Sequence, residues 1–314
     1  MKNKNSILIT AYVNPDLDGY AGIFAYAEFL GKQGKEVLAA IVGAPRTEAQ
    51  YVLDRFKITP LTVILGSQDF SEIILVDASD LKGLDSQMEA SKVIEIIDHR
   101  QINEADKFPR AKVQIEFVGA AATLIAEKFI ANNVAISSEA AILLYSAITS
   151  NTLNFKAGVT TERDLAAAAW LRSELEISDG YWKELFLAKS DTSGDKLFKL
   201  MASEFASFQI AGKKLSIVQL ELIGAEKIVE ERERDILEVL RALKAEHNLD
   251  CIFLTIIELE KEKNYFVTED LGLKMTLEKV LGARFVGPVG VREGMIMRKQ
   301  IMPLIKAEWE KEGV

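Results

Sequence analysis

Short runs of apolar residues alternate with helix-like patterns through the first half of the chain. The apolar runs cover residues 7–12, 37–42, 73–77, 93–98 and 113–117. Continuous runs of this length are typical of parallel strands that are covered on both faces. Apolar residues at helical spacing follow in the segments 21–33, 47–56, 120–132, 138–150 and 161–175. This alternation predicts an α/β domain with a doubly wound, mainly parallel sheet.

The pattern changes over residues 176–195, where Ser, Asp and Gly interrupt the apolar periodicity. Beyond it we expect a helix, a strand, a charged helix, two strands and a last helix at 197–206, 215–222, 225–247, 251–259, 265–268 and 303–311. This order predicts a smaller α+β domain. The predicted domains are 1–187 and 197–314, joined by a linker at 188–196. The glycines between 282 and 294 predict a flexible turn region.

The composition is that of an ordinary globular chain, with 49% hydrophobic and 27% charged residues. A net charge of −9 argues against binding to duplex nucleic acid. The single cysteine, Cys251, cannot form an internal disulfide, which favours a reducing cytoplasm. The longest apolar stretches fall far short of the roughly 20 residues that a membrane span needs. We therefore expect a cytoplasmic protein with no membrane contact.

Acidic side chains gather where the predicted strands end. Asp16 and Asp18 follow the first strand, Asp77 ends another, and Asp98-His99 ends the next. The carboxyl ends of parallel strands meet at one sheet edge, where ligands bind. Carboxylates gathered there repel one another unless a cation intervenes, and oxygen ligands with one imidazole suit Mn²⁺ or Mg²⁺. Acids in such places also serve as turn and helix-capping residues, and the pattern alone leaves both interpretations open.

Six segments, in order along nearly the whole chain, resemble the motifs of the DHH phosphoesterases, and specifically of the manganese-dependent family II inorganic pyrophosphatases. The segments are ITAYVNPDLD (9–18), LVD (75–77), IDHR (97–100), VGAAAT (118–123), SNTLNFK (150–156) and RKQIMP (298–303). The resemblance implies a DHH domain followed by a DHHA2 domain, with a small phosphorylated substrate held between them. It also implies one or two Mn²⁺ (or Mg²⁺) ions and a homodimer.

The resemblance also implies roles for individual side chains. The first metal would be held by Asp16 and Asp77, and the second by Asp18, Asp77 and His99. Together with Arg100, these residues would form the catalytic centre. The expected contacts to substrate phosphates come from Arg100, Lys156, Arg298 and Lys299.

Three positions of the first predicted domain depart from the family motifs. Tyr12 stands where the first metal has a histidine ligand, and a phenol with a pKa of about 10 is a poor ligand. Asn151 stands where the second metal has a carboxylate, so it offers a neutral oxygen. Arg100 replaces the second His of Asp-His-His with a permanent cation that can bind phosphate.

The changes at Tyr12 and Asn151 weaken both expected metal sites. We therefore expect a metal-dependent phosphohydrolase in which water attacks a phosphoanhydride or phosphoester, with low turnover of pyrophosphate. One alternative is a catalytically impaired protein that binds a phosphate or nucleotide and has a regulatory role. Another is a phosphodiesterase that acts on small nucleotides.

Overall fold

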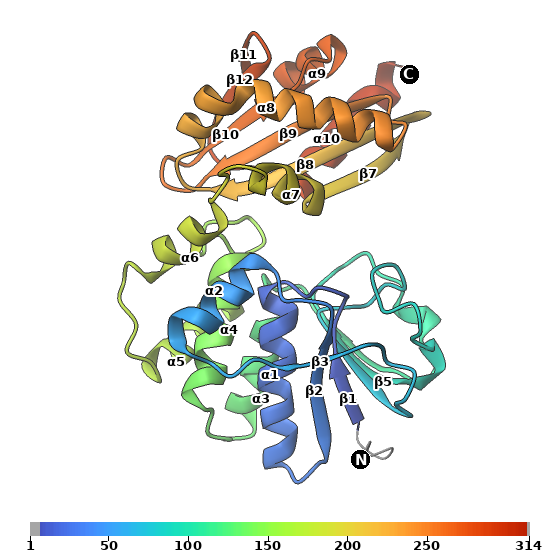
Figure 1. Cartoon of the computed structure of the whole chain (residues 1–314), viewed down its shortest axis with the longest axis vertical. Coiled ribbons are helices and arrows are strands. Elements are labelled where there is room, and N and C mark those ends of the chain that lie inside the picture. Colours follow the sequence, from blue (N-terminus) through green and yellow to red (C-terminus); the bar gives the residue numbers. More distant parts are fainter. Residues whose placement is uncertain (1–6, 313–314) are drawn as a thin grey trace. The chain divides into compact units, whose positions relative to one another are not determined.

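The computed structural model describes residues 7–312, and these form two compact units that divide after Leu185 (Figure 1). Helix α6 (Tyr181–Lys189) spans this division, so the first two residues of the expected linker at 188–196 are helical. The domain boundaries deduced from the sequence stay a prediction. Within the described residues, no helix is long and apolar enough to cross a bilayer.

The first unit contains a six-stranded sheet in which every pairing is parallel. Its strands are β1 (Ile7–Thr10), β2 (Val37–Val42), β3 (Thr62–Ile64), β4 (Ile73–Val76), β5 (Val93–Asp98) and β6 (Lys112–Ile115). Their order in space is β3-β2-β1-β4-β5-β6. This sheet confirms the predicted α/β class. The order reverses between β1 and β4, which creates a crevice at that point of the carboxyl edge.

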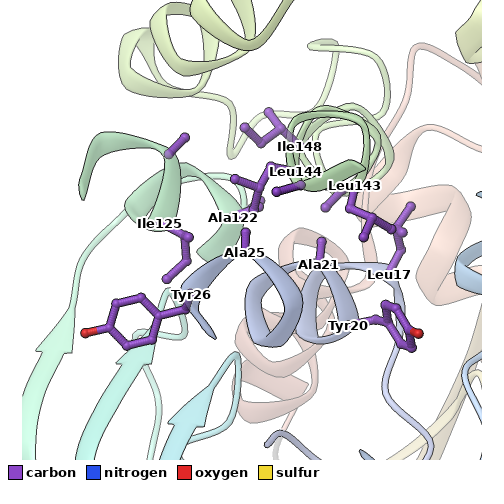
Figure 2. Packing of buried hydrophobic residues seen from close by; sticks show 14 of the residues in the cluster. Leu17, Tyr20, Ala21, Ala25, Tyr26, Ala122, Ile125, Leu143, Leu144 and Ile148 are labelled. Atoms are coloured by element: carbon purple, nitrogen blue, oxygen red, sulfur yellow. The ribbon is translucent and has the colours of Figure 1, made fainter. Parts of the chain in front are cut away.

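Five helices of this unit are α1 (Leu17–Lys32), α2 (Thr47–Phe56), α3 (Ala121–Ala131), α4 (Ser138–Asn151) and α5 (Glu162–Ser173). Helix α1 packs on the sheet and against α3 and α4. Figure 2 shows Ala21 and Ala25 of α1 directed toward Ala122 of α3 and Leu143 and Leu144 of α4. Small alanine side chains at this interface let the helices approach closely, so the amino end of α3 lies beside the start of α1.

The second unit contains a six-stranded mixed sheet in the order β11-β12-β10-β9-β8-β7. Its strands are β7 (Phe205–Ile210), β8 (Lys213–Leu222), β9 (Cys251–Glu258), β10 (Lys263–Val267), β11 (Arg284–Val286) and β12 (Val289–Glu293). Its helices are α7 (Lys196–Ser203), α8 (Ala225–Glu246), α9 (Leu271–Leu281) and α10 (Arg298–Glu312). Only β8 and β9 pair in parallel. Separate hydrophobic clusters lie on the two faces of the sheet, and the unit confirms the predicted α+β domain.

Several local predictions were wrong. Helix α1 begins at Leu17 rather than residue 21, because the Asp16 carboxylate accepts a hydrogen bond from Gly19 N (3.0 Å) and caps the first turn. The helix expected over 197–206 ends at Ser203, and β7 follows. The glycine-containing segment 282–294 forms the hairpin β11–β12 rather than a flexible turn. Helix α10 begins five residues before Pro303, which lies inside it.

The contact between α1 and β4 generates a first testable prediction. A Cβ atom on Gly22 would lie 2.3 Å from Val76 Cγ1. We expect Gly22→Ala to lower the free energy of unfolding by about 1–3 kcal/mol, because the buried helix must shift away from the sheet. Gly31→Ala, in the same helix with nothing within 4 Å of its Cβ position, is the matched control and is expected to be neutral or stabilising. Urea denaturation of both variants checks this, and equal midpoints would contradict it.

Candidate metal centre

The crevice between β1 and β4 is where the chain brings its predicted acidic residues together. Asp16 and Asp18 lie in the segment after β1, and Asp77 is the first residue after β4. His99 follows β5, the next strand of the sheet. The topology alone therefore places side chains from three neighbouring strand ends at one edge, as the sequence predicts.

Asp18, Asp77 and His99 converge into a cluster. His99 Nε2 lies 3.8 Å from Asp18 Oδ2 and 3.6 Å from Asp77 Oδ1. Each residue offers one ligand atom, and all three atoms lie within 4.8 Å of one another. Both carboxylates are buried, and the imidazole is half-buried. Two carboxylate oxygens with one imidazole nitrogen are a donor set that suits Mn²⁺ or Mg²⁺.

A backbone contact orients the imidazole. His99 Nδ1 lies 3.0 Å from the carbonyl oxygen of Val118. A hydrogen bond from Nδ1–H to this carbonyl leaves Nε2 without a proton and free to bind a cation. Val118 precedes Gly119 in the segment leading to α3, so this segment fixes the histidine that would hold the ion.

Asp18 is held by the amino end of α3. Its Oδ2 accepts a hydrogen bond from Ala121 N, and its Oδ1 accepts one from Ala122 N, both at 2.8 Å. Oδ2 also accepts a bond of 2.8 Å from Asn151 Nδ2 at the end of α4. Burial, and then the charge of Asp16, raises the pKa of Asp18 to about 7, although the α3 amides oppose this shift. An ion bound there must therefore displace a proton at mildly acidic pH.

Asp164 anchors the segment that holds both Asp18 and His99. This buried carboxylate accepts hydrogen bonds from Gly119 N (3.0 and 2.9 Å), Thr123 Oγ1 (2.6 Å) and Thr161 N (2.7 Å). It also completes a capping box with Thr161 at the start of α5. Asp164 was not among the residues predicted from the sequence. Its only signal was a Thr-x-x-Asp pattern before a helix.

Arg100 binds two buried carboxylates through one nitrogen atom. Nη1 donates to Asp77 Oδ1 (2.8 Å), Asp98 Oδ1 (2.9 Å) and the Asp77 carbonyl (2.7 Å). Burial strongly raises the pKa of Asp77, and Arg100 opposes that shift. Burial disfavours the charge on Arg100, but Asp77 and Asp98 raise its pKa above its ordinary value. Asp98 also accepts a hydrogen bond from Ser79 Oγ. No ligand or substrate role was predicted for Asp98 from the sequence.

Tyr12 meets the site through its ring rather than its hydroxyl. The hydroxyl accepts hydrogen bonds from Ser79 N (3.2 Å) and Asp80 N (3.0 Å). The guanidinium carbon of Arg100 lies 5.1 Å from the centre of the Tyr12 ring, which is a cation–π distance. Burial raises the pKa of Tyr12 to about 12, although Arg100 opposes the shift. A neutral hydroxyl bonded to the backbone is poorly suited to bind a metal.

The remaining predicted residues lie outside this cluster. Lys156 is exposed, and its Nζ lies 5.9 Å from the ring centre of Trp182. Arg298 and Lys299 belong to the second unit. There Arg298 Nη1 donates to the carbonyls of Glu204 (2.7 Å) and Ile217 (3.2 Å), and burial lowers its pKa. Contacts of these three residues with a substrate stay a prediction.

The side chains expected to hold the two metal ions differ in how their ligand atoms lie. Asp18, Asp77 and His99 present converging ligand atoms. By contrast, Asp16 Oδ1 accepts a hydrogen bond from Gly19 N at the start of α1, and the Tyr12 hydroxyl accepts hydrogen bonds from backbone amides. Asn151 turns its amide nitrogen toward Asp18.

Comparison with known proteins agrees with this architecture. Residues 6–148 match the model of the DHH family, N-terminal domain, and residues 183–307 match that of the DHHA2 domain. A manganese-dependent inorganic pyrophosphatase of Methanothrix thermoacetophila is 30% identical over 98% of this chain and 99% of its own. One from Bacillus subtilis is 29% identical over 95% of this chain and 97% of its own.

A comparison with a crystal structure supports the same family. The structure of a Methanococcus jannaschii protein assigned to the family II inorganic pyrophosphatases has a TM-score of 0.78 at 28% identity, covering 97% of this chain and 99% of that one. The two matched domains and the site at the sheet edge define a two-domain phosphoesterase of the DHH class. The chain belongs to the family of manganese-dependent, or family II, inorganic pyrophosphatases. The resemblance seen in the sequence motifs is thereby confirmed.

The Asn151–Asp18 contact generates the second prediction. We expect Asn151→Asp to bind Mn²⁺ roughly tenfold more tightly, or about 1.4 kcal/mol, because it adds a charged ligand. The metal-free variant should lose about 1–3 kcal/mol of stability, because a buried hydrogen bond gives way to like-charge repulsion. Isothermal titration and urea denaturation measure the two effects.

The control is Asn133→Asp, the same change in an exposed turn after α3. It should alter neither quantity. Unchanged manganese affinity in Asn151→Asp would mean that residue 151 does not reach the bound ion.

Proposed function

We propose that this chain is a manganese-dependent hydrolase of the family II pyrophosphatase type that uses water to cleave a phosphoanhydride or phosphoester bond. The observation that carries the proposal is the convergence of Asp18, Asp77 and His99 at the sheet edge of a chain that belongs to this family. In this proposal the three side chains hold the ion. When bound, the ion would lower the pKa of water and neutralise phosphate oxygens.

The chain's own groups would orient the substrate. Within residues 7–312, the hydrogen bonds of the Arg100 side chain all come from Nη1, which leaves the other guanidinium nitrogens for phosphate oxygens. Its side chain is 31% exposed, enough to contact a ligand. Lys156, Arg298 and Lys299 would add positive charge where negative charge develops in the transition state. Their contribution rests on the motif resemblance.

We also propose that pyrophosphate is a poor substrate. Asn151 supplies no negative charge to the ion, and the Tyr12 hydroxyl is bonded to the backbone. Fewer charged ligands hold metal less tightly, and an arginine bound to Asp77 competes for that carboxylate. A cytoplasmic location and a homodimer stay predictions from the sequence and the family resemblance.

The third prediction tests the activity. Purified protein with saturating Mn²⁺ should release phosphate from at least one member of a panel of anhydrides, monoesters and diesters. Its turnover of pyrophosphate should stay well below about 10² s⁻¹, a value that ordinary enzymes reach. Asp77→Asn should abolish release, because it removes a ligand shared by the ion and Arg100. Asp54→Asn, on an exposed face of α2, should leave it unchanged.

The results separate the alternatives. Manganese binding without product from any substrate would favour the binding-protein alternative. Release from dinucleotides alone would favour the phosphodiesterase alternative. Pyrophosphate turnover of 10²–10³ s⁻¹, the upper part of the ordinary range, would contradict the proposal of low activity.

A further inference from the structure

The metal centre already contains one cation that belongs to the chain. Arg100 Nη1 donates to Asp77 Oδ1 at 2.8 Å and to Asp98 Oδ1 at 2.9 Å. Asp77 Oδ1 is also the atom 3.6 Å from His99 Nε2. The same Asp77 oxygen therefore contacts the guanidinium and belongs to the group of side chains that would hold an ion.

We propose that the Arg100 guanidinium permanently takes the place of one of two metal ions, so that the chain binds a single divalent cation at Asp18, Asp77 and His99. The inference rests on the proposed function, because it concerns the same metal centre. It goes further by fixing the number of ions and by assigning the second positive charge to a side chain.

Charge balance supports this assignment. Asp18, Asp77 and Asp98 are buried, and Asp16 lies two residues before Asp18 at the same strand end. One guanidinium and one divalent ion offset three of these four negative charges. A second divalent ion would have to displace or approach a guanidinium that cannot lose its charge, and like charges at such distances repel strongly.

Two departures from the family motifs change the charge of the centre in the direction that this assignment requires. Replacing the second His of Asp-His-His with Arg100 adds one positive charge, and replacing Asp with Asn151 removes one negative charge. Together they change the centre by two positive charges, which is the charge of one divalent ion. Asn151 donates to Asp18 at 2.8 Å, where a carboxylate would need a cation between the two groups.

The ring of Tyr12 stabilises the position of the Arg100 guanidinium. The guanidinium carbon lies 5.1 Å from the ring centre, within cation–π range. The hydroxyl is fixed by the amides of Ser79 and Asp80. On the loop that packs against the ring, Gly83 has φ +97°, and a Cβ there would lie 3.1 Å from Tyr12 Cδ1. The ring is therefore held in place, and residues 12 and 100 act as a pair.

The fourth prediction counts metal ions. Wild-type protein, loaded with Mn²⁺ and freed of excess, should contain one ion per chain by elemental analysis. Its electron paramagnetic resonance spectrum should be that of an isolated Mn²⁺. The double variant Tyr12→His with Arg100→His should contain two ions per chain and show a spin-coupled spectrum. Arg100→Lys, which keeps the charge, should still contain one.

A stability measurement covers the case in which the double variant does not fold. Arg100→Gln removes the charge, and saturating Mn²⁺ should raise its unfolding temperature more than that of wild type, because a second ion can bind. Arg110→Gln changes an exposed arginine and should respond as wild type does. Equal shifts in Arg100→Gln and wild type would overturn the inference.

The possible failures are distinct. Two coupled ions in the wild type, or equal ion counts in Arg100→Lys and the double variant, would overturn this inference and leave the proposed function intact. A wild-type protein that binds no manganese would contradict the proposed function itself.

Discussion

The burial of several carboxylates at one sheet edge is the constraint on which the rest of this structure depends. Asp18, Asp77 and Asp98 are each at most 2% exposed, and a buried charge is costly unless it is paired and hydrogen-bonded. Each of these carboxylates is stabilised by its own set of contacts. Helix amides hold Asp18, Arg100 bridges Asp77 and Asp98, and a hydroxyl binds Asp98. The negative charge that these contacts do not offset creates a place where a cation can bind.

The fold supplies this edge through packing far from the chemistry. The reversal of strand order brings β1, β4 and β5 side by side. Small side chains lie between α1 and α3 (Figure 2), and they let the amides of α3 reach Asp18. Asp164 then ties the turn before α3 to the start of α5. One segment, 118–122, thus orients His99 and donates hydrogen bonds to Asp18, so the geometry of the ligands depends on how firmly α3 is held.

The sequence predicts the sheet, its carboxyl edge and the acids on it, because periodicity and strand ends are local properties. It does not predict that Arg100 turns back onto Asp77 or that the hydroxyl of Tyr12 binds the backbone of residues 79 and 80. Those outcomes depend on contacts between residues far apart in sequence. The role of Asp164 was not predicted for the same reason, since its partner Gly119 is 45 positions away in the sequence. Helix α9 was not predicted, although Leu273, Leu277 and Leu281 follow one another at helical spacing. The glycines of 282–294 suggested a flexible turn where the hairpin β11–β12 forms.

A guanidinium and a metal ion are two different ways to offset the negative charge of the buried carboxylates. A divalent ion brings two charges and an acidic water, but it exchanges with solvent and its affinity depends on pH. An arginine brings one charge that is always present, in a planar form suited to phosphate. Because Nη1 is bound to Asp77 and Asp98, the centre is partly neutralised before any ion arrives. If Arg100 replaces one ion, as we propose, the centre would offer phosphate a fixed cation and would keep a single ion to lower the pKa of water.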